Sequence, residues 1–116
     1  MTGFDVYNRC MALLGYTYQE GEYVVGKTLK ARFPEIFNQI LLDLKIEPTE
    51  DLSTDIPLNS KQKDALINGC AMLISLSEGD SDKNRLFTTL YNGKRASALS
   101  EKSFVEDAIP NVSGGN

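Results

Sequence analysis

The clearest chemical pattern lies at residues 21–28, GEYVVGKT, which fit the phosphate-binding motif G-x-x-x-x-G-K-[ST]. In nucleotide hydrolases this loop follows a buried β-strand, so that backbone N–H groups and a helix N-terminus converge on the phosphates. The preceding residues, YTYQE, contain too few apolar side chains for a buried strand. Residues 40–43, ILLD, are the best match to a strand ending in a magnesium-binding acid, but they continue a helical pattern. We therefore interpret Lys27 as a solvent-exposed helix residue.

The remaining side chains offer little for catalysis or metal binding. The chain contains no histidine, which removes the commonest general base and leaves serine and threonine nucleophiles without an activating partner. Cys10 and Cys70 lie among apolar helical neighbours, and two cysteines do not supply the four ligands of a typical structural zinc site. We interpret them as small buried hydrophobic residues. We predict that the protein is not an enzyme and binds no cofactor.

The net negative charge is concentrated in one segment. The formal charge is −4 at pH 7, and it arises from residues 46–58, IEPTEDLSTDIPL, which carry Glu47, Glu50, Asp51 and Asp55 and no base. Acidic and basic residues balance in the rest of the chain. Because tight binding to nucleic acid normally requires a cluster of lysine and arginine, we do not expect the protein to bind DNA specifically.

Length and composition indicate a single soluble domain. The chain has 116 residues, of which 41% are hydrophobic and 24% charged. No apolar run approaches the roughly 18 residues of a membrane span. The N-terminal residues, MTGFDVYNRC, lack the apolar core of a secretory signal, so we expect synthesis in the cytoplasm.

The segment around which the fold is organised is residues 59–79, NSKQKDALINGCAMLISLSEG. Asn59 and Gln62 have the spacing of a capping box. Only three of the residues from 65 to 76 are polar, so the helix is apolar over most of its circumference and must be covered on several sides. Gly69 costs about 1 kcal/mol relative to alanine in a helix interior. We expect a neighbouring helix to approach closely at that glycine.

Helical spacing predicts further helices on both sides of this segment. Residues 3–14 follow a capping box formed by Thr2 and Asp5. Residues 25–44 keep one helical phase across Pro34, which indicates either one long kinked helix or two nearly collinear helices. We favour two helices, with Pro34 at the start of the second. A last helix, capped by Asp80 or Ser81, carries apolar residues as far as Leu99 and is expected to weaken around Gly93. A further apolar set follows Ser100 and is stopped by Pro110. The predicted fold is all-α: a small bundle of four to five helices with a long acidic loop and a loose C-terminal tail. We assign the bundle to residues 1–103 and the tail to residues 104–116.

Two apolar segments have alternative interpretations. The loop at residues 16–23 carries Tyr16, Tyr18 and Tyr23, which either cover the end of the bundle or face another subunit, where tyrosine is enriched. The tail either folds back on the bundle or docks onto a partner. Its candidate docking residues are Phe104, Val105, Ile109 and Pro110.

Four stretches resemble the head–tail connector, or adaptor, proteins of tailed bacteriophages. YNRCMALLGY, residues 7–16, is similar to the first helix of that family, and FPEIFNQILLDLK, residues 33–45, to its second helix. ALINGCAMLISLSEGD, residues 65–80, followed by FTTLYNGKRA, residues 87–96, resembles its central helix, acidic turn and last helix. The resemblance covers the helices and not the tyrosine-rich or acidic loops.

This resemblance implies a non-enzymatic protein of the virion neck that is made in the bacterial host cytoplasm. Such a protein would form a homo-oligomeric ring, twelvefold in this family, on the portal protein. The ring would extend the DNA channel and present a surface to a downstream stopper or tail-completion protein. In that setting the acidic loop is a candidate channel lining, which DNA would pass without specific binding. The alternative is a monomeric or dimeric helical module for protein–protein interaction.

Overall fold

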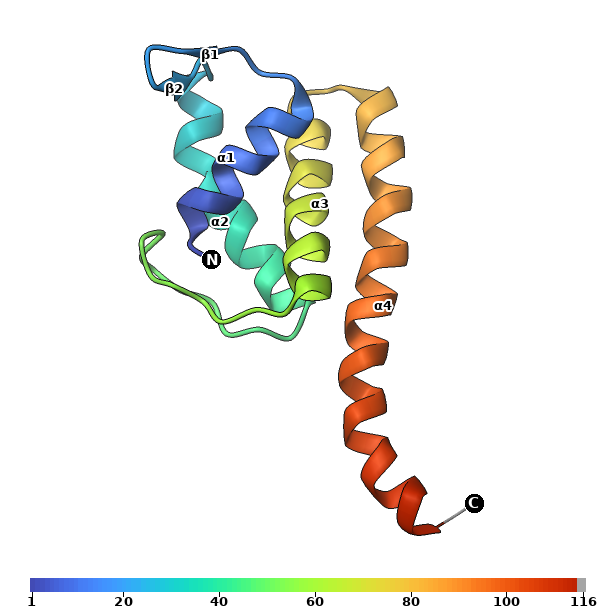
Figure 1. Ribbon diagram of the computed structural model, residues 1–116. Helices are drawn as coiled ribbons and strands as arrows, with labels where there is room; N and C mark the ends of the chain where they lie inside the picture. Colours follow the sequence, from blue (N-terminus) through green and yellow to red (C-terminus); the bar gives the residue numbers. More distant parts are fainter. Residues whose placement is uncertain (115–116) are drawn as a thin grey trace.

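The computed structural model describes the backbone of residues 1–114 and the side chains of residues 1–100. Four helices and a two-stranded hairpin follow in the order α1 (Gly3–Leu14), β1 (Tyr18–Gln19), β2 (Glu22–Tyr23), α2 (Lys27–Asp43), α3 (Ser60–Ser77) and α4 (Ser81–Gly114). Helices α1, α2 and α3 pack together, and α4 lies along α3 and extends past it (Figure 1). The predicted all-α fold is confirmed, with four helices in the described part of the chain.

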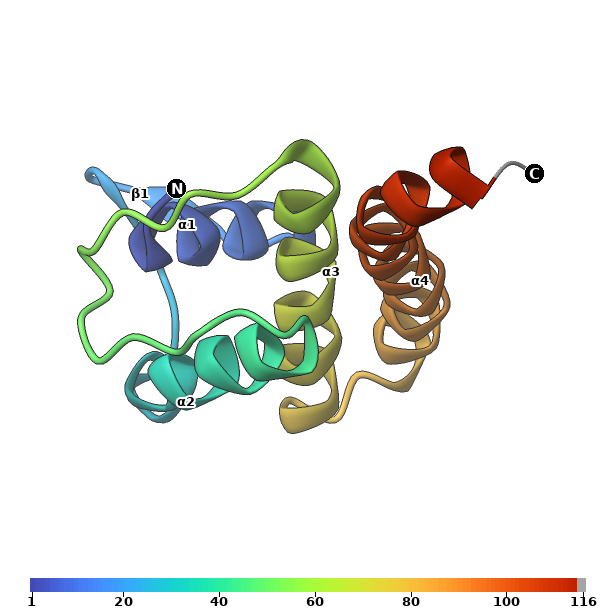
Figure 2. The ribbon, with the colours of Figure 1, turned by 90° about the horizontal axis from the view of Figure 1, so that it is seen from below.

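Helix α3 is central, as its apolar circumference predicts. Seen from below, it lies between the α1–α2 pair and α4 (Figure 2). The expected close approach at Gly69 is confirmed, because a Cβ atom there would lie 2.7 Å from Ile40 Cγ2 of α2 and 2.7 Å from Tyr91 Cε1 of α4. Two neighbouring helices therefore meet α3 at the residue that has no side chain.

The helix starts follow the capping signals of the sequence. The Thr2 hydroxyl accepts a hydrogen bond from the Asp5 N–H at 3.1 Å, and the Asp5 carboxylate accepts one from the Thr2 N–H at 2.9 Å. Asn59 and Gln62 exchange the same pair of bonds at the start of α3, at 2.8 and 3.0 Å. Asp80 caps α4 by accepting from the Lys83 N–H at 3.1 Å. These local bonds satisfy N–H groups that have no partner within the helix.

Residues 27–43 form one helix, so the prediction of two collinear pieces is wrong. Pro34 lies inside α2 and removes one backbone hydrogen bond, at a cost of about 3 kcal/mol. Six apolar residues of one face are buried on both sides of it: Leu29, Phe33, Ile36, Phe37, Ile40 and Leu41. Each buried side chain of this size contributes about 1.5–3 kcal/mol. Burial of the continuous face therefore outweighs the loss at the proline.

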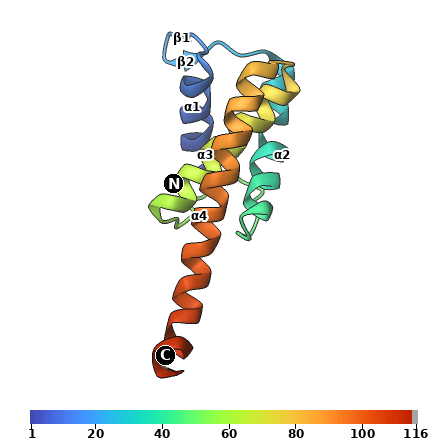
Figure 3. The ribbon, with the colours of Figure 1, turned by 90° about the vertical axis from the view of Figure 1, so that its right-hand side faces the viewer.

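Helix α4 is continuous through Gly93, where the sequence predicts weakening. Its backbone also continues past Pro110 to Gly114, so the predicted stop at the proline is wrong. Proline within a helix removes a single bond and is compatible with a kink instead of an end. The side view shows α4 running well beyond the end of the bundle (Figure 3). This projection gives the molecule its longest dimension, 56 Å.

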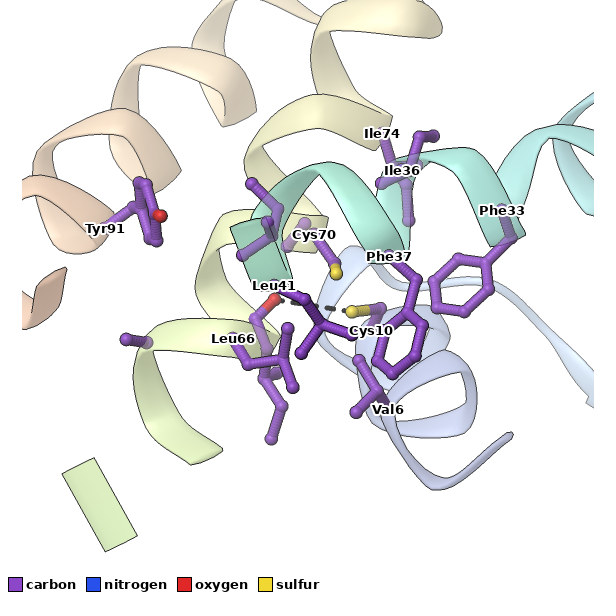
Figure 4. Packing of buried hydrophobic residues seen from close by; sticks show 14 of the residues in the cluster. Val6, Cys10, Phe33, Ile36, Phe37, Leu41, Leu66, Cys70, Ile74 and Tyr91 are labelled. Carbon is purple, nitrogen blue, oxygen red and sulfur yellow. Dashed lines mark hydrogen bonds between the residues drawn. The ribbon is translucent and has the colours of Figure 1, made fainter. Parts of the chain in front are cut away.

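The core is formed where the inner faces of the helices meet. Cys10, Phe37, Leu41 and Leu66 contribute to it from α1, α2 and α3, and all four are fully buried (Figure 4). None of the described helices has the length and hydropathy needed to cross a membrane.

Candidate interaction surfaces

The acidic loop between α2 and α3 is held against the bundle by backbone and amide hydrogen bonds. The Asn38 side chain binds Thr49 twice, donating to its carbonyl at 2.8 Å and accepting from its N–H at 2.9 Å. The Leu52 carbonyl accepts from the Phe4 N–H at 3.2 Å, and the Ile56 N–H donates to the Met1 carbonyl at 2.9 Å. Leu52, Ile56 and Leu58 pack on the core cluster. The loop is therefore a fixed surface.

The four acids of this loop differ in their surroundings. Asp51 accepts from the N–H and the hydroxyl of Ser53, at 2.8 and 2.7 Å, and these bonds lower the pKa of its carboxyl. Asp55 accepts from the Met1 ammonium group at 2.5 Å. Glu47 and Glu50 are exposed and make no ion pair with the described side chains. The loop thus presents to solvent three carboxylates, those of Glu47, Glu50 and Asp51, that have no cationic partner among the described side chains.

Two of the three tyrosines of the predicted loop lie on the strands of a short hairpin that the sequence does not predict. Tyr18 pairs with Tyr23 across β1 and β2, and their rings meet edge to face with centroids 4.9 Å apart. Tyr23 and Tyr16 pack on the core cluster, and the Tyr16 hydroxyl donates to Glu78 at 3.1 Å. Tyr18 is 60% exposed. Two of the tyrosines therefore cover the bundle, and Tyr18 alone projects from it.

The phosphate-binding motif has a different structure here. Gly21 is in the hairpin turn with φ +84°, and strand β2 follows directly, inside the motif. Gly26 is the N-cap of α2, and Lys27 is an exposed residue of its first turn. The backbone between the two glycines is extended and does not wrap around the helix N-terminus, as a phosphate-binding loop requires. The interpretation of Lys27 as a solvent-exposed helix residue is confirmed.

Both cysteines are free thiols in the core, as the sequence predicts. Cys10 donates to the Ile67 carbonyl at 3.3 Å, and burial raises the pKa of the Cys70 thiol well above its ordinary value. Within the described side chains no cluster of three or more histidine, cysteine or acidic residues could hold a metal ion.

Helix α4 meets its neighbours differently on its two flanks. We call the side toward α2 the closed flank: there the Tyr91 hydroxyl donates to the Asp43 carboxylate, and Arg95 Nε donates to the same oxygen at 2.9 Å. Tyr91 is only 3% exposed. Burial, followed by the contact with Asp43, raises the pKa of Tyr91. The Tyr91 ring and the ion pair between Asp43 and Arg95 therefore cover this flank.

The opposite side, toward α1, is open. Leu86 and Leu90 are one turn apart on α4 and are 54% and 37% exposed, and Leu13 of α1 is 50% exposed. A groove of about 490 Å³ runs between α1 and α4, with α3 as its floor. It is lined by Arg9, Ala12, Leu13, Asp64, Ile67, Asn68, Leu90 and Lys94. We call this the α1–α4 groove. The sequence does not reveal it, because each of its leucines fits a helical stripe and the rotation of α4 decides which of them are left uncovered.

The candidate docking residues of the tail, Phe104, Val105, Ile109 and Pro110, lie outside the residues whose side chains the structure describes. Their role remains a prediction. The structure does not bring the acidic loop and the tyrosine hairpin together into one site. They are separate surfaces of one bundle.

Comparisons with models of protein families, with curated proteins and with solved structures give no match to this chain. The resemblance to head–tail connectors therefore rests on the sequence patterns of the helices.

Proposed function

We propose that this chain is a ring-forming head–tail connector of a tailed bacteriophage, located in the neck of the virion. The observation that carries the proposal is the form of α4. Residues 81–98 of α4 pack on α3 through residues such as Phe87 and Tyr91, and the backbone then projects beyond the bundle (Figure 3). A helix that leaves its own domain presents a segment that a neighbouring ring can bind. The sequence resemblance supplies the identity of that neighbour, the portal protein.

The surface chemistry supports the same proposal. A channel wall must let DNA slide past, and lysine or arginine facing the channel would hold its phosphates. The exposed Glu47 and Glu50 give the acidic loop the opposite charge. The loop is also fixed to the bundle by the paired hydrogen bonds between Asn38 and Thr49. We assign it to the channel side of the ring, with the tail toward the portal and another face toward the stopper or tail-completion protein.

The test is reconstitution with the portal protein encoded beside this chain in its genome. Native mass spectrometry of the mixture should show twelve copies bound per portal ring. Absence of a portal gene nearby, or no binding to that portal at assembly concentrations, would contradict the proposal.

A truncated protein tests the part played by the tail. Deletion of the residues after Ser103 should leave the helical circular dichroism of the bundle and its cooperative unfolding in place, because every buried residue of the described core precedes that point. The same deletion should abolish attachment to the portal. Normal attachment by the truncated protein would exclude the tail as the docking segment.

A helical module for protein–protein interaction is the second candidate, favoured by the exposed leucines of the α1–α4 groove. It differs from the connector in stoichiometry. A module would stay a monomer or dimer with or without portal, which the same native mass spectra would show.

A further inference from the structure

We propose that the α1–α4 groove binds the β1–β2 hairpin of a second copy of this chain. The inference rests on the ring-forming function proposed above, and it names the two surfaces that join adjacent subunits. A ring requires two different complementary surfaces on each subunit, because each copy contacts one neighbour through one surface and the next neighbour through the other.

The groove has the composition of a docking site. Leu13 and Leu90 form its walls, 50% and 37% exposed, over a floor that includes the nearly buried Ile67. Lys94 and Asp64 pair at 2.5 Å on its rim. The centre is thus apolar and the rim polar, which is the usual arrangement of a protein interface.

The hairpin has the form of a rigid projection that fits such a groove. Tyr18 and Val24 are 60% and 55% exposed, although both are apolar or aromatic. The Tyr18 ring is braced edge to face against Tyr23, and the Val24 N–H closes the hairpin by donating to the Thr17 carbonyl at 2.8 Å. A tyrosine that is already held in place loses little entropy on binding, and tyrosine is among the residues that dominate interface energies.

Charge complementarity identifies the hairpin, among the apolar surfaces of the chain, as the occupant. Glu20 lies in the hairpin turn and Glu22 begins β2, and residues 16–24 carry no base. The groove carries Arg9, Lys94 and Asp64, with Lys94 and Asp64 already paired. Arg9 forms no ion pair or hydrogen bond with the described side chains. The Asp5 carboxylate, one turn earlier on α1, interacts with Arg9 electrostatically without a hydrogen bond. The guanidinium donors of Arg9 are therefore still available for a carboxylate of the incoming hairpin.

The two surfaces are placed so that one copy does not fill its own groove. The hairpin lies on the side of the bundle away from α4 (Figures 1 and 2). Docking therefore joins copies head to tail. Repetition of such a contact gives a closed ring when the rotation between copies closes, and an open filament when it does not.

Disulfide cross-linking between two full-length variants tests the contact directly. Tyr18→Cys protein is mixed with Leu90→Cys protein under mild oxidation, and the mixed dimer is quantified by mass spectrometry. The native Cys10 and Cys70 are buried and do not compete. We expect the mixed dimer to form at least tenfold faster than with Leu76→Cys, a matched control whose leucine is 63% exposed on α3 outside the groove. Equal rates for Leu90→Cys and Leu76→Cys would overturn the proposal.

Charge reversal tests the register of docking. Arg9→Glu in the Leu90→Cys protein should slow cross-linking severalfold, because it places like charges together. Glu20→Arg and Glu22→Arg in the Tyr18→Cys protein should restore the rate with that partner. A rate that stays slow in the double-reversed mixture would contradict the assigned pairing.

These experiments contain no portal, so they fail independently of the proposed function. If rings form on the portal while cross-linking is unselective, the connector function stands and the hairpin–groove contact is wrong. If cross-linking is selective but nothing binds the portal, the contact stands and the connector function is wrong.

Discussion

The two flanks of α4 show how one helix serves both folding and surface exposure. On the closed flank, Tyr91 and Arg95 converge on Asp43, and Tyr91 is buried against the backbone of α3 at Gly69. On the open flank, Leu86 and Leu90 remain 54% and 37% exposed. Both flanks carry large side chains. They differ in how much of each side chain the neighbouring helices bury.

The residues of the closed flank stabilise the fold through burial, whereas the exposed residues of the open flank contribute less to the folding free energy. Burial of an apolar side chain is the main source of folding free energy, so a leucine left half exposed contributes only part of what it could. Two such leucines on α4 beside Leu13 on α1 form a contiguous apolar surface that folding leaves uncovered. We expect substitutions on the closed flank to change stability and substitutions on the open flank to change association.

The largest expected effect is that of Tyr91→Ala, compared with Leu90→Ala. Tyr91 is 3% exposed, and its removal would leave a cavity beside Gly69 and free the Asp43 carboxylate of one donor. The free energy of unfolding should fall by about 3–5 kcal/mol, the range for large aromatic residues in cores. Leu90→Ala, at the adjacent position, should cost less, about 1 kcal/mol, because the Leu90 side chain is 37% exposed and its loss leaves no enclosed cavity. Urea denaturation followed by circular dichroism measures both, and equal losses would erase the distinction between the flanks.

The second comparison uses two glycines that differ only in what surrounds them. Gly69→Ala gains about 1 kcal/mol of helix propensity, but its Cβ would come within 2.7 Å of Ile40 and Tyr91. Overpacking of this kind costs about 1–3 kcal/mol, and the ring of Tyr91 is fixed by Asp43, so we expect a net loss of about 1 kcal/mol.

Gly93→Ala on α4 is the matched control, since a Cβ there would meet no atom within 4 Å. It should raise the unfolding free energy by about 0.5–1 kcal/mol. We therefore predict that Gly69→Ala lowers the free energy of unfolding and that Gly93→Ala raises it. Thermal unfolding of both variants measures the two changes. Stabilisation by Gly69→Ala would mean that the α3–α4 contact is looser than the structure shows.

The sequence predicts the closed side of the molecule better than the open side. The cap at Asn59, the central place of α3 and the close approach at Gly69 follow from local chemistry and from the need to cover an apolar helix. The α1–α4 groove does not follow, because Leu13 and Leu90 fit the same helical pattern as buried leucines. Only the rotation of α4 about its axis decides which flank is covered, and that rotation depends on the packing of all four helices.

The hairpin and the unbroken α2 were missed for more local reasons. A two-residue hairpin turn with positive φ at both positions is usually marked by Asn-Gly or Asp-Gly. Here the pair is Glu20 and Gly21, with φ of +50° and +84°, and glutamate does not carry that signal. At Pro34 the local rule predicts a break, and burial of the apolar face on both sides overrides it.

The third prediction compares a polar contact on each flank. Tyr91→Phe keeps the buried ring and removes only the hydroxyl that donates to Asp43, so it should cost about 1 kcal/mol. Lys94→Met removes the ion pair with Asp64 at the groove rim, whose side chains are 32% and 54% exposed. Exposed pairs of this kind contribute little, so we expect less than about 0.5 kcal/mol. Guanidinium denaturation of both variants, with Arg95 left intact, gives the comparison. If Lys94→Met lowers the free energy of unfolding more than Tyr91→Phe does, the polar contacts of the open flank stabilise the fold more than those of the closed flank, and the prediction is wrong.

The smallest change in stability is expected from Tyr16, which lies near the start of α4. There the Lys83 ammonium group donates to the Leu14 carbonyl at 2.7 Å, and Tyr16 donates to Glu78 beside it. Burial, together with the Glu78 carboxylate, raises the pKa of Tyr16 from its ordinary value of 10.0 to about 12. Since ionisation is harder in the folded state, the stability that Tyr16 contributes is fully present below pH 10 and is lost as the pH rises from 10 to about 12.

Tyr16→Phe tests this because phenylalanine does not ionise. The unfolding free energy of the wild type minus that of Tyr16→Phe should fall between pH 10 and pH 12, as measured by urea denaturation at several pH values. Lysine deprotonation in the same range affects both proteins and cancels in the difference. Tyr18→Phe controls for the loss of one phenol hydroxyl, since the Tyr18 hydroxyl makes no hydrogen bond with the described residues. If the difference stays constant up to pH 12, the contact between Tyr16 and Glu78 does not persist in solution.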